Sequence, residues 1–145
     1  MDRQLIINFN NVVCHNDITI HAGDFTLLKN SKNVYEKYIS KLNGNHIFLK
    51  GSHDYWLDQN KSQQIWEKTI HGFYFVVCHY AMRTWARSHY NSFQLFGHSH
   101  GHLLATGKQY DIGVDNNKFY PISARSIIEL MESKSDNENF IGIKK

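Results

Sequence analysis

Residues 68–79 read KTIHGFYFVVCH and contain the longest uninterrupted apolar run of the chain, Phe73 to Cys78. Gly72 separates two short runs that are rich in β-branched and aromatic residues. This pattern predicts a strand, a turn and a second strand. His79 follows the second run directly, so a side chain that commonly ligates metals or transfers protons is expected at the end of that strand.

Periodic apolar patterns on both sides of this stretch predict further elements. Helices are expected over 2–13, 31–42 and 124–131, the second with Ser31 as its N-cap. Strands are expected over 18–21, 46–50, 92–96 and 109–114, and residues 101–106 could form another strand or a bend. Helices alternating with strands predict an α/β fold in which helices cover a layered sheet. From position 133 the polar sequence SKSDNEN predicts a frayed end, which gives a domain over 1–132 and a tail over 133–145.

Composition excludes several classes of protein. The chain has 145 residues, of which 41% are hydrophobic and 14% aromatic, too many for a disordered chain. The apolar runs are far shorter than the ~20 residues of a membrane span, so neither a membrane span nor a secretory signal is expected. Lys and Arg are scattered and the net charge is only +3, which argues against a nucleic-acid target. Two cysteines, Cys14 and Cys78, cannot build a disulfide framework, so a cytoplasmic location is expected.

Histidine is the unusual residue of this chain, with ten copies. Four short segments each place an Asp or a His at the end of an expected strand, and a glycine lies within three of them: HAGD at 21–24, GSHD at 51–54, VCHY at 77–80 and GHSH at 97–100. Strand ends open onto a common crevice in α/β folds, so these side chains are expected to converge. Their chemistry suits Mn, Fe, Zn or Ni and is too rich in nitrogen for calcium.

Each segment also has a simpler interpretation. Asp24 alone would be a turn residue, and His79 alone would be a core histidine. His98 and His100 are more specific, because side chains at i and i+2 of a strand point to the same face. A structural zinc module built from Cys14-His15 and Cys78-His79 is a further alternative, but its spacing does not match a closed zinc site.

The motifs GDF at 23–25, GSHD at 51–54, CHY at 78–80 and GHSH at 97–100 resemble, in order, the second to fifth motifs of the calcineurin-like metallophosphoesterases. Segments 111–115 and 120–123 are similar to a small bacterial and phage branch of that family. The resemblance runs from about residue 1 to 128. It implies an α/β metallophosphoesterase-type layered β-sandwich flanked by helices.

The resemblance also implies metal ligands. Asp24 would bridge two metal ions, and Ser52 would take the place of an Asn that ligates the second ion. His79 and His98 would complete that second site, and His100 would belong to the first. Ser52 departs from the family pattern because a hydroxyl is a shorter and weaker ligand than an amide oxygen.

Catalytic roles follow from the same resemblance. His53 would be the general acid that protonates the leaving alkoxide, and Asp54 would orient its imidazole. Arg83 could steady a phosphate oxygen, although an exposed arginine with no role is the alternative. The implied reaction is hydrolysis of a small phosphomonoester or phosphodiester by a hydroxide that divalent transition-metal ions activate.

The family's first motif, Asp-x-His on a central strand, has no counterpart in this sequence. The chain is therefore expected to be truncated at its N-terminus, to bind one or two ions, and to cover the vacant strand position by forming a homodimer. The alternative function is a non-catalytic, oligomeric metal-binding remnant of a phosphoesterase.

Overall fold

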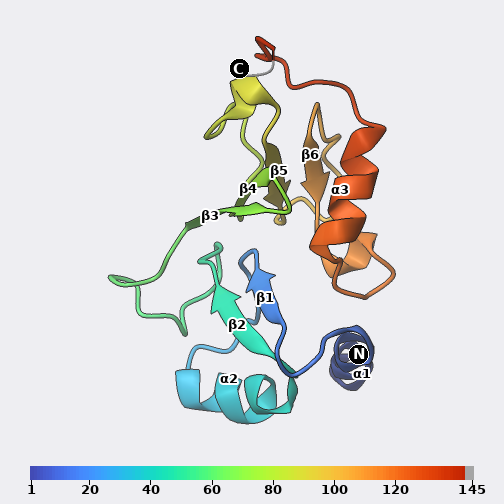
Figure 1. The fold of residues 1–145 in the computed structure, drawn as a ribbon. Helices are drawn as coiled ribbons and strands as arrows, with labels where there is room; N and C mark the ends of the chain where they lie inside the picture. The colour runs from blue at the N-terminus through green and yellow to red at the C-terminus, as the bar shows by residue number, and fades with distance from the viewer. Residues whose placement is uncertain (143–145) are drawn as a thin grey trace.

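Two β-sheets form the framework of residues 1–142, the part of the chain that the computed structural model describes (Figure 1). The smaller sheet pairs β1 (Ile18–His21) with β2 (Asn45–Phe48) in parallel. The larger sheet has the order β3-β4-β5-β6, in which β3 and β4 are antiparallel and the other neighbours parallel. These strands are β3 (Ile65–Ile70), β4 (Phe73–Cys78), β5 (Phe93–Phe96) and β6 (Gln109–Asp111). The α/β class expected from the sequence is confirmed.

The helices lie beside these sheets. They are α1 (Asp2–Val12), α2 (Ser31–Lys37) and α3 (Ala124–Glu132), and short 3₁₀ turns cover Ile39–Lys41, Ser88–Tyr90 and Val114–Asn116. The first and last helices agree with prediction. The second is shorter than expected, and its cap is Asn30, whose side-chain oxygen accepts the backbone N–H of Asn33 at 3.1 Å. Within the described range, no helix combines the length and apolar character needed to cross a membrane.

The core lies between the two sheets and α3. Buried side chains from β4, β5 and α3 pack against Leu49, which follows β2, and against partly buried residues of β1 and β2; the buried members are Leu49, Phe75, Val77, Phe93, Leu95, Ile127 and Met131. Neighbouring residues on β4 point to opposite faces, yet Val76 and Val77 are both buried. Burial on both faces explains why this strand has an unbroken apolar sequence.

The hairpin expected at 68–79 is confirmed. Its turn, His71-Gly72, has positive φ at both residues, as tight two-residue hairpin turns require. Elsewhere the strand predictions extend too far. Residues 101–106 form turns and bends rather than a strand, and the strand expected over 109–114 ends at Asp111.

The polar tail is anchored where fraying was expected. Asn137 is 4% exposed, and its amide donates to the carbonyls of Ser88 and Ser92 at 2.9 and 3.0 Å. Its own side-chain oxygen accepts the backbone N–H of Lys108 at 2.7 Å. A polar sequence can therefore dock through hydrogen bonds to the backbone. Residues 143–145 of the expected tail lie outside the described range.

Candidate metal centre

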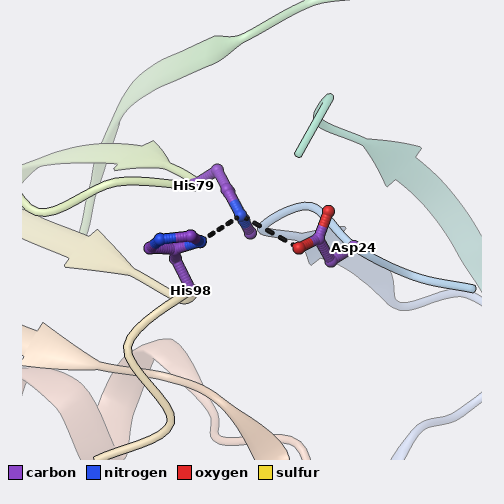
Figure 2. Close-up of side chains that lie close together, drawn as sticks. All are labelled: Asp24, His79 and His98. Atoms are coloured by element: carbon purple, nitrogen blue, oxygen red, sulfur yellow. Dashed lines mark hydrogen bonds and ion pairs between the residues drawn. The ribbon is translucent and has the colours of Figure 1, made fainter. Parts of the chain in front are cut away.

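Four polar side chains meet where β1, β2, β4 and β5 end. They follow these strands in order and are Asp24, Ser52, His79 and His98. Figure 2 shows Asp24 and His98 on either side of the His79 imidazole. The ends of β4 and β5 are tied together because the backbone N–H of Gly97 donates to the carbonyl of His79 at 3.1 Å. The expected convergence of strand ends is present for these four residues.

The Nε2 atom of His79 lies at the middle of the cluster. It is 3.2 Å from Oδ2 of Asp24, 3.1 Å from Nδ1 of His98 and 3.3 Å from Oγ of Ser52. Ligands about 2.1 Å from a tetrahedral ion lie roughly 3.4 Å from one another. The three separations from Nε2 of His79 therefore match those between neighbouring ligands of a single ion. Asp24, His79 and His98 each offer one ligand atom, and these atoms all lie within 4.8 Å of one another.

The hydrogen bond made by Nδ1 of His79 determines which of its two ring nitrogens carries the hydrogen. Nδ1 lies 2.9 Å from the backbone carbonyl of Ala22, and the ring is only 2% exposed. A carbonyl can only accept a hydrogen bond, so Nδ1 carries the hydrogen and Nε2 of the neutral ring presents a lone pair. The carboxylate of Asp24 is also an acceptor. Two acceptors 3.2 Å apart are favourable neighbours when a cation, either an additional proton or a metal ion, lies between them.

The backbone around these ligands is unusual. Asp24 and His98 have φ of 55° and 59°, a left-handed conformation that residues other than glycine rarely adopt. Such conformations cost free energy and concentrate at functional sites. Gly51 is required by close approach rather than by its φ, because a Cβ there would meet the backbone nitrogen and Oδ1 of Asp24.

The Asp54 carboxylate has other partners than the His53 imidazole that it was expected to orient. Its buried carboxylate accepts the backbone N–H groups of Asp24 and Gly51 on Oδ2, at 2.6 and 2.8 Å. Oδ1 accepts the backbone N–H of Phe25 and the indole N–H of Trp56, both at 3.0 Å. Among the described residues no hydrogen bond joins this carboxylate to the His53 imidazole. Asp54 therefore braces the loop that carries Asp24.

His53 lies at the edge of the cluster. Its backbone N–H donates to Oδ1 of Asp24 at 2.7 Å, while the residue itself is exposed. This oxygen of Asp24 is thus held by the backbone, and Oδ2 is left to face His79. The imidazole of His53 is free to meet a ligand that approaches from solvent.

His100 and Arg83 lie apart from the four-residue cluster. The ring of His100 is exposed, and its Nδ1 contacts Oδ2 of Asp115 at 2.6 Å. The same-face argument for His98 and His100 was wrong because β5 ends at Phe96 and both histidines have left-handed φ. Arg83 forms a two-point ion pair with Glu138, with N–O distances of 2.7 and 3.3 Å, and both side chains are exposed.

The cysteines do not build a zinc module in the described structure. Cys14 is exposed, whereas Cys78 is buried and donates its thiol hydrogen to the carbonyl of Tyr80 at 2.8 Å. Burial raises the pKa of the Cys78 thiol, which disfavours the thiolate that metals bind.

His21 and His46 form a second pair of histidines, on the small sheet. Nε2 of His21 is 3.1 Å from Nδ1 of His46. The His21 ring packs against Phe48 and Phe25, with centroids 4.5 and 4.9 Å away. Burial, and after it the neighbouring His46, lower the pKa of His21 to about 3. His21 is therefore neutral near pH 7 and serves packing.

Comparisons with known proteins support the fold and leave the function open. No family model matches the chain. An uncharacterized protein of Methanocaldococcus jannaschii is 26% identical over 139 residues, a match that covers 91% of this chain and 76% of that protein. The crystal structure of a protein of unknown function from Aquifex aeolicus superimposes with a TM-score of 0.66 at 23% identity, over 89% of this chain and 84% of that one. The overall fold is thus shared with a solved protein.

Proposed function

We propose that this chain is a metal-dependent phosphoesterase of the calcineurin-like type, acting on a small phosphomonoester or phosphodiester. The observation that carries the proposal is the pair of acceptor atoms, Nε2 of His79 and Oδ2 of Asp24, which face each other at 3.2 Å, an arrangement that a shared metal ion would stabilise. The two sheets that enclose one core support a metallophosphoesterase-type sandwich as part of the same proposal.

The donor set suits a divalent transition metal. One carboxylate and two imidazoles are ligands of borderline character, for which Mn, Fe, Zn and Ni are suitable partners. Asp24, His79 and His98 would hold the ion, with Ser52 near the fourth position. When bound, such an ion activates water and offsets the negative charge of a phosphate group. The ligand geometry supports one ion per chain, since His100 pairs with Asp115 instead.

His53 is the proposed general acid. Its backbone is fixed to the ligand Asp24, and its side chain reaches solvent beside the cluster. From this position the ring can give a proton to the leaving oxygen of a bound phosphoester. It can do so without contributing to the metal site.

Activity against aryl phosphates tests this proposal. The purified chain, loaded with Mn²⁺ or Zn²⁺, should release nitrophenol from nitrophenyl phosphate or from its bis-ester. His53→Ala should lower turnover about 10²–10⁴-fold while the metal content stays unchanged. His15→Ala, which removes another exposed imidazole, is the matched control and should have no effect. Loss of metal in step with activity in His53→Ala would contradict the assigned role.

A non-catalytic metal-binding protein is the second candidate. It is favoured by the separation of His100 from the other ligands, because a phosphoesterase of this type uses two ions. Full metal binding without turnover on either ester would select this candidate. A homodimer is proposed with both functions, and sedimentation at micromolar concentration tests it.

A further inference from the structure

Tyr80 packs against the candidate metal centre, although it is not one of the proposed metal ligands. Its hydroxyl is 3.0 Å from Oγ of Ser52. Its ring packs edge-on against both histidines of the cluster, with centroids 4.8 Å from the rings of His79 and of His98. One side of the residue is still open to solvent, since Tyr80 is 52% exposed. Tyr80 thus contacts three of the four residues that form the cluster.

Buried polar groups fix the backbone of Tyr80. Its carbonyl accepts the thiol hydrogen of Cys78 and the side-chain amide of Gln94, at 2.8 and 3.2 Å. Gln94 is fully buried, and its own oxygen accepts the amide of Gln109 at 2.7 Å. A buried amide is costly unless it is hydrogen-bonded, so this chain of contacts holds Tyr80 in one place.

The hydrogen of the Ser52 hydroxyl has two acceptors within reach. One is Nε2 of His79 at 3.3 Å, and the other is the oxygen of Tyr80 at 3.0 Å. When a cation takes the lone pair of Nε2, the oxygen of Tyr80 is the one of these two acceptors that remains. A hydrogen bond from Ser52 to Tyr80 then turns the lone pairs of Oγ toward the cluster.

We propose that Tyr80 is a positioning residue of the metal centre: its hydroxyl accepts the Ser52 hydrogen, and this orients Oγ of Ser52 as the fourth ligand. The inference rests on the proposed function, because it requires a metal ion at Asp24, His79 and His98. The hydrogen bond would give the weak hydroxyl ligand a fixed orientation. Residues that orient a ligand in this way commonly change metal affinity about 10–100-fold when they are replaced.

Titration of the metal-free chain with Co²⁺, followed by visible absorption, tests this role without any assay of activity. Tyr80→Phe keeps the ring and its contacts and removes only the hydroxyl. We expect Co²⁺ to bind this variant about 10-fold more weakly than the wild type. Ser52→Ala should cause a similar loss, and the double variant should lose no more than either single change, because both remove the same interaction.

Tyr35→Phe is the matched control, since it removes an exposed hydroxyl on α2 and should leave Co²⁺ affinity unchanged. Wild-type affinity in Tyr80→Phe, or additive losses in the double variant, would overturn the positioning role while leaving the metal centre intact. A wild-type chain that binds no Co²⁺ would overturn the metal centre itself and this inference with it. The two failures are therefore distinguishable.

Discussion

The carboxylate of Asp54 accepts the backbone N–H of Asp24 at 2.6 Å and thereby joins the loop after β2 to the loop after β1. The same oxygen also accepts the backbone N–H of Gly51 at 2.8 Å. Two strand ends that carry proposed ligands are thus held together by a carboxylate that is itself no part of the cluster. This brace sets the position of Asp24 before any ion binds.

Asp54→Asn should destabilise the protein. Each carboxylate oxygen accepts two N–H groups, so an amide in either orientation sets its NH₂ against two donors. Buried donors without acceptors cost about 1–3 kcal/mol each, and we expect about 3 kcal/mol less free energy of unfolding by urea titration. Glu129→Gln, an exposed change on α3, is the control. Unchanged stability in Asp54→Asn would contradict the bracing role.

Alanine should destabilise the protein at one glycine of the site and be tolerated at another. A Cβ at Gly51 meets the backbone nitrogen and Oδ1 of Asp24, whereas a Cβ at Gly97 meets nothing closer than 3.5 Å. Neither glycine has a positive φ, so the comparison isolates steric contact. Gly51→Ala should lower stability by about 1–3 kcal/mol and weaken metal binding, while Gly97→Ala should be tolerated in both. Equal tolerance would show that the Asp24 loop is not tightly packed.

Acid should unfold the protein through His21. Its pKa is lowered to about 3 in the folded chain, against about 6.5 when unfolded, so the unfolded state binds more protons between these values. The free energy of unfolding is therefore unaffected by His21 above pH 6.5, and it decreases by up to about 1.4 kcal/mol per pH unit as the pH falls toward 3. Urea titrations from pH 7 to 4 measure this slope.

His21→Phe removes the titrating group but keeps an aromatic ring beside Phe48, so its slope should be shallower. His15→Gln, at an exposed position, should keep the wild-type slope. The pKa of His46 is also lowered by burial, which leaves a smaller dependence in the first variant. Identical slopes for His21→Phe and the wild type would refute the assignment.

The sequence predicted the parts of the site that depend on local pattern. Short runs rich in β-branched and aromatic residues predict strands, so the ends of β1, β4 and β5 could be placed, and with them Asp24, His79 and His98. The hairpin around Gly72 was predicted for the same reason. Their convergence followed from a general property of α/β sheets.

Features that depend on distant contacts were not predictable in this way. Asp54 follows His53 in the sequence, but two of the hydrogen bonds of its carboxylate reach a loop about thirty residues away. His100 turns toward Asp115 because the backbone leaves the strand before position 98. Asn137 is buried by carbonyls that only the folded loop of 88–92 brings together. The periodic pattern of apolar residues within a strand or helix does not predict any of these contacts.

Metal stoichiometry tests the central claim most directly. Elemental analysis of the purified chain after dialysis against Zn²⁺ or Mn²⁺ should give one ion per chain, and the His79→Ala/His98→Ala variant should hold none. His100→Ala should keep the full content, because that ring lies outside the cluster. Binding should weaken as the pH falls, because protons compete with the ion for the ligand imidazoles. Full metal content in the His79→Ala/His98→Ala variant would contradict the account.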